Sequence, residues 1–112
     1  MPNIEIKTVT LKAGTKYLTA YNDNNIIGSV FLEKRGKIAE FWGLEVSPRM
    51  QRQGVGSSLL MNVENIAGGD GVNELRGILP AGYRKDNAIK FYKQQGFSID
   101  EVSGTIEKKI RF

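Results

Sequence analysis

The segment KIAEFWGLEVSPRMQRQGVGSS, residues 37–58, decides the fold. Residues 37–46 are apolar on both faces near their end, which is typical of a strand at the centre of a sheet. The pattern changes at Pro48, and from Gly54 onward apolar side chains recur at helical spacing until the run GGDG at residues 68–71. The segment therefore predicts a central strand over residues 37–46, then a loop, then a helix that begins at Gly54.

Strand patterns lie on both sides of this segment. They are short runs of alternating or continuously apolar residues, bounded by turn-forming residues, over residues 4–8, 17–21, 26–33, 74–79, 97–102 and 105–112. A second helix is predicted over residues 87–95, with Asp86 as its N-cap and Gly96 as its C-cap.

The order of these elements predicts the fold class. Strands joined by tight turns pair in antiparallel fashion, whereas a strand, helix, strand order is a right-handed crossover between parallel neighbours. We therefore expect an α/β fold of the mixed α+β kind. It has a mostly antiparallel sheet of six to seven strands, with a parallel central pair and two covering helices. No repeat or linker interrupts the pattern, so residues 1–112 are predicted to form one domain.

Composition excludes several kinds of chemistry. The 112 residues include neither cysteine nor histidine, which rules out thiol nucleophiles, disulfides, Ser-His-Asp catalysis and the usual zinc and iron-sulfur sites. We expect no metal. The formal net charge of +4 favours anionic ligands such as phosphates but does not call for nucleic acid.

The expected location is the cytoplasm. The N-terminal residues MPNIEIKTVTLKAG alternate between apolar and polar, where a signal peptide would have a basic segment followed by an apolar run. Apolar stretches are only a few residues long, far below the ~18 that a membrane-spanning helix needs. No membrane partner is expected.

A candidate phosphate-binding loop lies between the central strand and the first helix. Glycines let the backbone approach a ligand, and the free N–H groups of a helix start converge on an anion. The alternative is a tight turn with a closely packed helix start. The pattern is neither a Walker loop nor a dinucleotide-binding loop, because Ser57 follows Gly56 and Leu59 stands where the last glycine would be. The loop residues are Gln51, Arg52, Gln53, Gly54, Val55, Gly56 and Ser57.

These residues resemble the signature of the Gcn5-related N-acetyltransferase (GNAT) superfamily: Gln or Arg, two residues, Gly, one residue, then Gly or Ala. The preceding LEVSP, residues 44–48, is similar to the central strand of that family and its exit. A second family element, an Ala followed by an aromatic-Tyr pair and Gly-Phe, is similar to residues 88–97, AIKFYKQQGF. The resemblance covers roughly residues 40–97.

The resemblance implies acetyl-CoA as co-substrate and direct acetyl transfer to a primary amine. It implies binding of the coenzyme by the loop, by the backbone of Leu44 and Val46, and by Tyr92. Where the family usually places a coenzyme-binding Asn, this chain has Lys85, with Asn87 nearby as the candidate. The chain is also a short member, because about residues 13–16 replace the two helices that usually join the first two strands.

Three side chains are candidates for proton transfer. Tyr92 stands where many family members keep a Tyr that protonates the coenzyme sulfur, although an aromatic residue on such a helix face is also a common core residue. Glu40 stands where the protein-modifying branch of the family keeps its general base. A carboxylate on a mostly buried strand loses solvation, which is expected to raise its pKa toward the range that a base at neutral pH requires. Glu45 competes with it and, by strand alternation, is expected on the opposite face, while Trp42 shares the face of Glu40.

Two other functions remain open from the sequence. The chain could be a catalytically silent GNAT-fold module that binds coenzyme A or an interaction partner, or a small basic nucleic-acid-binding domain. For the enzyme, the acceptor is a small molecule or a polypeptide. Because the missing helices leave apolar surface and an open cleft, we expect a homodimer and an amine on a polypeptide.

Overall fold

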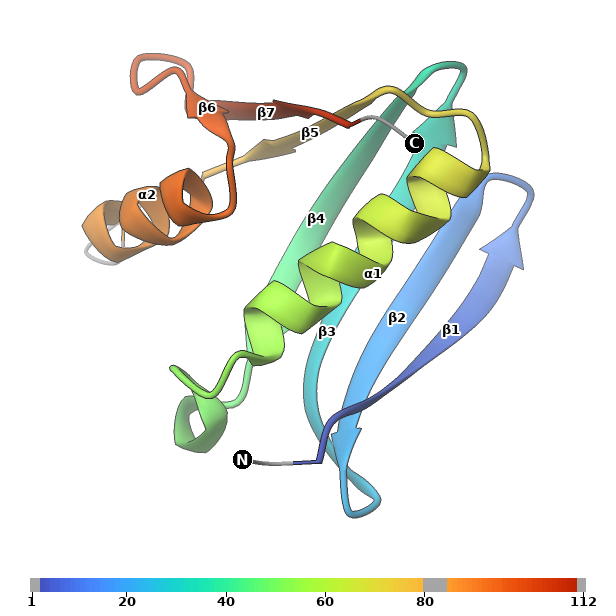
Figure 1. Ribbon diagram of the computed structural model, residues 1–112, viewed down its shortest axis with the longest axis vertical. Coiled ribbons are helices and arrows are strands. Elements are labelled where there is room, and N and C mark those ends of the chain that lie inside the picture. The colour runs from blue at the N-terminus through green and yellow to red at the C-terminus, as the bar shows by residue number, and fades with distance from the viewer. Residues whose placement is uncertain (1–2, 80–84, 111–112) are drawn as a thin grey trace.

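The computed structural model describes residues 3–79 and 85–110 of the chain. They form a seven-stranded sheet with two α-helices, and the strand order is β1-β2-β3-β4-β5-β7-β6 (Figure 1). The elements are β1 (Glu5–Lys12), β2 (Thr15–Asn22), β3 (Asn25–Arg35), β4 (Ile38–Val46), a 3-10 turn (Pro48–Met50), α1 (Val55–Gly69), β5 (Glu74–Ile78), α2 (Lys85–Gln94), β6 (Ser98–Ile99) and β7 (Thr105–Lys109). Among these strands only β4 and β5 pair in parallel. The predicted fold class is confirmed.

The core lies on one face of the sheet. Side chains alternate along β2 and β3, and α1 lies across the inward-facing set, as Figure 1 shows. Burying one Val or Leu side chain contributes about 1.5–3 kcal/mol, so this layer is the main source of stability. Its buried members include Leu18, Val30 and Leu32 from the sheet and Val55, Leu59 and Val63 from α1.

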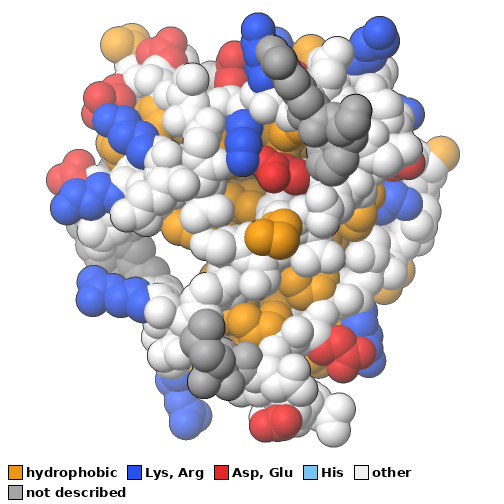
Figure 2. Space-filling model, viewed as in Figure 1, with side chains coloured by type: hydrophobic (Ala, Val, Ile, Leu, Met, Phe, Trp, Pro, Cys, Tyr) orange, Lys and Arg blue, Asp and Glu red, His pale blue; other side chains and the backbone are white. Residues whose placement is uncertain are grey.

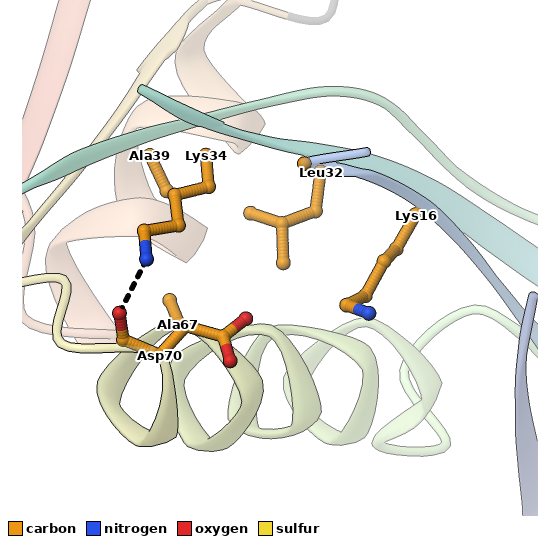
Figure 3. A pocket seen from close by; sticks show the side chains of 7 residues that line it. Lys16, Leu32, Lys34, Ala39, Ala67 and Asp70 are labelled. Carbon is orange, nitrogen blue, oxygen red and sulfur yellow. Dashed lines mark hydrogen bonds between the residues drawn. The ribbon is translucent and has the colours of Figure 1, made fainter. Parts of the chain in front are cut away.

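The C-terminal end of α1 is fixed to the sheet by charged side chains. Lys34 of β3 donates from Nζ to the backbone oxygen of Asp70 over 2.7 Å, with Lys16 of β2 alongside (Figure 3). A cation there complements the negative end of the helix dipole. Lys108 of β7 forms an ion pair with Glu64 of α1. The side chains around the pocket of about 220 Å³ in Figure 3 therefore cap the C-terminal end of α1 and orient this helix on the sheet.

β4 and β5 separate soon after they meet. Ile38, Ala39 and Glu40 have partners on β5, whereas the remainder of β4 has no register partner there. The other edge of β4 remains paired with β3 up to Val46. Beyond Glu40, every second residue of β4 directs its backbone N–H and C=O groups toward the β5 side. These groups have no partner on β5 and are therefore free to bind a ligand.

A β-bulge at Gly43 interrupts the regular alternation of β4. Ser29 of β3 lies opposite Glu45, and Phe31 lies opposite Trp42, so β4 has one residue more than β3 between these pairs. Gly43 has a φ of +63°, in the left-handed region that favours glycine. The bulge shifts every later side chain of β4 to the other face relative to plain alternation.

The structure corrects several predicted boundaries. α2 begins at Lys85, so Asp86 lies in its first turn instead of being its N-cap. The strand predicted over residues 97–102 is only β6, because the carboxylate of Asp100 accepts hydrogen bonds from the backbone N–H groups of Ser103 and Val102 and closes a turn. These bonds lower the pKa of Asp100. The last two residues of the predicted C-terminal strand lie outside the described residues.

The connection between β1 and β2 is only residues 13–14, which confirms the short form expected from the sequence. Neither helix in the described part of the chain has the length and apolar character needed to cross a membrane.

Candidate functional site

A cleft of about 990 Å³ opens where β4 and β5 separate. Its walls are β4 from Phe41 to Val46, α2, and the loop that leads into α1. In the space-filling view the molecule is hollowed between α1 and α2 (Figure 2). The cleft thus lies beyond the carboxyl end of β4, where ligands of open α/β sheets bind.

The first turn of α1 presents free backbone N–H groups to this cleft. Gly54 precedes the helix with a φ of +82°, and no side chain caps the helix start within the described residues. The first intrahelical bond in this turn runs from Ser58 N–H to Gly54 O over 3.0 Å, which leaves the N–H groups of Val55, Gly56 and Ser57 without a helical acceptor. Three convergent donors at the positive end of a helix dipole suit a pyrophosphate.

The two loop glycines serve different purposes. A Cβ at Gly54 would meet nothing within 4 Å, so glycine is needed there for the positive φ. A Cβ at Gly56 would lie 3.1 Å from Cζ of Phe91, so glycine at this position lets α2 pack against α1. Gln51 donates from its side chain to the backbone oxygen of Val46 over 3.3 Å and ties the loop to the end of β4.

All the predicted coenzyme-binding residues except Gln53 border the cleft. Gln53 is exposed and lies outside it. The residues that do border it are Leu44, Val46, Gln51, Arg52, Gly54, Val55, Gly56, Ser57, Asn87 and Tyr92.

Several residues in or directly after α2 also border the cleft, and Gln94 and Gln95 among them were not predicted as site residues. Gln95 donates from Nε2 to Oγ of Ser57 over 2.9 Å and so links the end of α2 to the loop. Lys90 and Gln94 also border the cleft. Their spacing with Asn87 and Phe91, three to four residues apart, places them on one side of α2, and this helical period is the signal that could have identified them.

Tyr92 belongs to the core and to the cleft at once. Its ring lies 6.1 Å from Phe41, 5.1 Å from Phe91 and 5.5 Å from Phe97, centroid to centroid, and the residue is 7% exposed. It also borders the cleft. Burial raises the pKa of Tyr92 to about 12, so the phenol keeps its proton at neutral pH and can donate it.

The two candidate bases lie on the same face of the sheet. Glu40 pairs with Glu33 and Glu45 with Ser29, and these two residues of β3 are four positions apart. The expectation that they point to opposite faces is therefore wrong, because plain alternation does not count the extra residue at Gly43. Trp42 shares this face, as expected.

Burial does not desolvate Glu40. Its side chain is 48% exposed, and its carboxylate lies 4.0 Å from Nη1 of Arg35. Glu40 does not border the cleft, whereas Glu45 does. Glu45 has no ion pair within residues 3–79 and 85–110. Of the two carboxylates, only that of Glu45 therefore lies at the cleft.

Comparison with known proteins identifies the class of protein that this fold and site define. A family model described as the Acetyltransferase (GNAT) family matches residues 3–97. The chain therefore belongs to the GNAT acetyltransferase family. No curated protein matches the sequence significantly.

Solved structures of acetyltransferases share the fold. The PaiA N-acetyltransferase from Thermoplasma acidophilum in complex with coenzyme A is 26% identical, with a TM-score of 0.77 over 86% of this chain and 61% of that chain. This chain thus spans less than two thirds of that relative. The IAA acetyltransferase from Bacillus cereus is 17% identical, with a TM-score of 0.79 over 96% of this chain and 100% of that one.

The ribosomal-protein-S18-alanine N-acetyltransferase from Escherichia coli is 18% identical, with a TM-score of 0.76 over 90% of this chain and 72% of that one. At such identities the likeness concerns the fold. Among the described residues no group of acidic side chains could hold a metal ion.

Proposed function

We propose that this protein is an acetyl-CoA-dependent N-acetyltransferase that moves the acetyl group directly to a primary amine. The observation that carries the proposal is the uncapped start of α1, which opens into a cleft bordered by the unpaired edge of β4. The coenzyme pyrophosphate would lie at the N–H groups of Val55, Gly56 and Ser57. Its pantetheine arm would lie along β4 near Leu44 and Val46, with Asn87 on the facing helix.

The proposed reaction needs a base and an acid. Glu45, directly or through a water molecule, takes the proton from the ammonium form of the acceptor. The amine nitrogen attacks the thioester carbonyl, whose developing negative charge a free N–H of β4 stabilises. The carbon–sulfur bond then breaks, and Tyr92 donates its proton to the leaving thiolate. Glu40 remains a second candidate base, acting at longer range.

The proposed acting unit is one domain over residues 1–112, located in the cytoplasm, where the coenzyme A thioester is available. We also propose a homodimer. β1 is an edge strand that pairs only with β2 among the described strands, and most of its side chains are exposed, including Val9 at 53%. An exposed edge of this kind is a template for pairing with a second chain.

A silent coenzyme-binding module is the second candidate. The exposure of Glu40 and its ion pair with Arg35 favour it, because they leave Glu45 alone of the two candidate bases at the cleft. Both candidates bind the coenzyme, and only one turns it over.

The experiment that tests the proposal measures binding and turnover separately. Acetyl-CoA should raise the midpoint of thermal unfolding, because a ligand that binds only the native state stabilises it by mass action. A panel of primary amines, followed by release of the free coenzyme thiol, should show turnover. Binding without turnover on any amine would leave the silent module. The absence of binding would contradict both candidates.

A further inference from the structure

Three aromatic rings form a continuous row on the face of the sheet opposite α1. Tyr17 of β2 pairs with Phe31 of β3, which pairs with Trp42 of β4. The ring centroids are 4.6 Å apart for Tyr17 and Phe31 and 5.4 Å apart for Phe31 and Trp42, and the latter two rings are stacked with planes 6° apart. We call these three residues the aromatic ladder.

The aromatic ladder is continuous with the cleft and is partly open to solvent, since Tyr17 and Phe31 are half-buried and Trp42 is exposed. Trp42, at one end of the ladder, is 43% exposed and also borders the cleft. Both described helices lie on the other face: α1 covers the buried side of β2 and β3, and Tyr92 of α2 contacts Phe41, which points to that same side. A molecule that reaches into the cleft beside Trp42 can therefore extend over the ladder without obstruction from a helix of the described chain.

The charge around the aromatic ladder differs between its two ends: β3 and β4 carry carboxylates, whereas β1, beside β2, adds Lys7 and Lys12 on the same face. On this face β2, β3 and β4 carry the carboxylates of Glu33, Glu40 and Glu45 and a single cation, Arg35. Arg35 contacts Glu33 over 3.2 Å and Glu40 over 4.0 Å, which leaves Glu45 without an ion pair in the described chain. The aromatic surface is thus acidic at its β4 end, beside the cleft, although the whole chain has a formal net charge of +4.

At the β4 end, the neighbouring strand β5 does not cancel the negative charge. Arg76 of β5 lies beside Glu40 in the parallel pair, but it contacts Glu74 over 2.8 Å and Glu107 over 3.8 Å. Aromatic faces and carboxylates together attract cationic side chains, because a guanidinium or ammonium gains from both the ring quadrupole and the opposite charge.

We propose that the aromatic ladder is a docking surface for an extended basic polypeptide segment. Lysine and arginine side chains of the segment lie on the rings and pair with Glu45 and Glu40, while the acceptor amine enters the cleft beside Trp42. An extended chain advances roughly 3.3–3.6 Å per residue, so the ladder accommodates about three residues. This inference identifies the acceptor class of the proposed acetyl transfer. Acetylation of the bound amine rests on that proposed function, whereas binding of the peptide does not.

A second copy of this chain is the alternative occupant of the surface. A two-fold axis along the row of rings would place Glu40 and Glu45 of one copy against the same carboxylates of the other, and like charges in contact are unfavourable. The homodimer proposed above uses the edge of β1 instead and leaves the ladder free.

Binding can be tested without turnover, because Trp42 is the single tryptophan of the chain. With the coenzyme site saturated by coenzyme A, a short peptide that alternates arginine and lysine with alanine should change the Trp42 fluorescence. A peptide with glutamate at the basic positions should not. The Tyr17→Leu variant should weaken binding of the basic peptide by about fivefold, the gain expected of one exposed cation–π contact.

Matched variants separate the aromatic ladder from general effects. Tyr21→Leu removes the same kind of ring from the same face of β2 but outside the ladder, and it should leave binding unchanged, while Tyr17→Phe should retain it. Glu45→Gln should reduce both affinity and its dependence on salt.

Three results would overturn the proposal. These are no fluorescence response to the basic peptide, an equal response to the acidic one, or equal effects of Tyr17→Leu and Tyr21→Leu. A change of oligomeric state in Tyr17→Leu by light scattering would instead assign the surface to a second copy. Binding of the basic peptide without its acetylation would leave the docking surface in place and contradict the proposed function.

Discussion

Ser57 lies where the cleft meets the first turn of α1, and it offers a test of the coenzyme loop that does not weaken the fold. An aspartate at this position can still accept the hydrogen bond from Gln95. Its negative charge near the N-terminus of a helix stabilises the folded protein by about 0.3–1 kcal/mol. The same charge repels a pyrophosphate. We therefore expect Ser57→Asp to keep or raise the stability of the free protein and to lower the affinity for acetyl-CoA at least tenfold by calorimetry.

The neighbouring residue supplies the control. Ser58 lies in the same turn but does not border the cleft. Ser58→Asp brings the same charge to nearly the same place, and we expect it to change the affinity less than threefold. Equal losses in the two variants would show that general charge, and not contact with the loop, determines coenzyme binding.

Tyr92 makes the stability of the protein depend on pH in the alkaline range. Burial raises its pKa to about 12 from the ordinary tyrosine value of 10.0, so the native state retains the phenol proton that the unfolded chain loses. The stabilising contribution is thus complete below pH 10 and is lost as the pH rises through 12. A shift of two pKa units corresponds to about 2–3 kcal/mol in the free energy of unfolding.

Tyr92→Phe should remove this part of the alkaline destabilisation and also slow acetyl transfer, while the aromatic packing with Phe41 and Phe97 persists. The measurement is urea unfolding of both proteins between pH 9 and pH 11, together with turnover at neutral pH. Identical pH dependence in the two proteins would contradict the assigned pKa. Unchanged turnover would remove Tyr92 from the proposed mechanism.

At the scale of elements, the bulge at Gly43 determines which face of the sheet the later side chains of β4 occupy. Gly43 and Gly36 have nearly the same positive φ, +63° and +64°, so alanine strains the backbone similarly at both. A Cβ at Gly43 would also lie 3.2 Å from Cδ2 of Phe31, whereas one at Gly36 would meet nothing within 4 Å. Gly43→Ala should therefore be less stable than Gly36→Ala by about 1 kcal/mol in urea unfolding.

The same pair of variants tests the site. Gly43→Ala should reduce acetyl transfer because it displaces Glu45, and Gly36→Ala should not. If both variants retain full activity, the bulge is a structural feature without a catalytic consequence.

Most helices and strands could be predicted from the sequence, because each one follows from the pattern of neighbouring residues. The helical spacing from Val55 to Val63 reflects a face buried on the sheet, and the loop before it combines glycines with the end of a central strand. The direction of Glu45 could not be predicted from alternation alone, since it depends on one extra residue in β4. Gly43 within a strand pattern was the available signal.

Other features depend on tertiary contacts that the sequence does not reveal. The exposure of Glu40 follows from the absence of a covering element over that face in the described chain, and the short β6 follows from the turn closed by Asp100. The link from Gln95 to Ser57 joins residues 38 positions apart. Pairing over such distances along the chain is a property of the assembled fold.

At the scale of the whole molecule, the open edge of β1 predicts a change of assembly on substitution. Lysine on an exposed edge strand opposes pairing between sheets. Val9→Lys should therefore shift the protein from dimer to monomer in light scattering, while Val102→Lys, in an exposed turn away from β1, should not. A monomeric parent protein at micromolar concentration would contradict the proposed homodimer.

The two faces of the sheet also predict the kinetic mechanism. The N–H groups of α1 that would hold the coenzyme lie on the helix side, whereas Glu45 and Trp42 lie on the opposite face, and the gap between β4 and β5 joins the two sides. Donor and acceptor can therefore occupy the gap together from opposite sides.

With neither cysteine nor histidine in the sequence, the chain has none of the residues that most readily carry an acetyl group between two half-reactions. Transfer should accordingly take place within a ternary complex, and double-reciprocal plots at several fixed acceptor concentrations should intersect. Coenzyme A should compete with acetyl-CoA but not with the acceptor, because product and acceptor occupy opposite sides of the sheet. Parallel lines, or an acetylated enzyme isolated in the absence of acceptor, would contradict binding from two sides and require a covalent intermediate on another side chain.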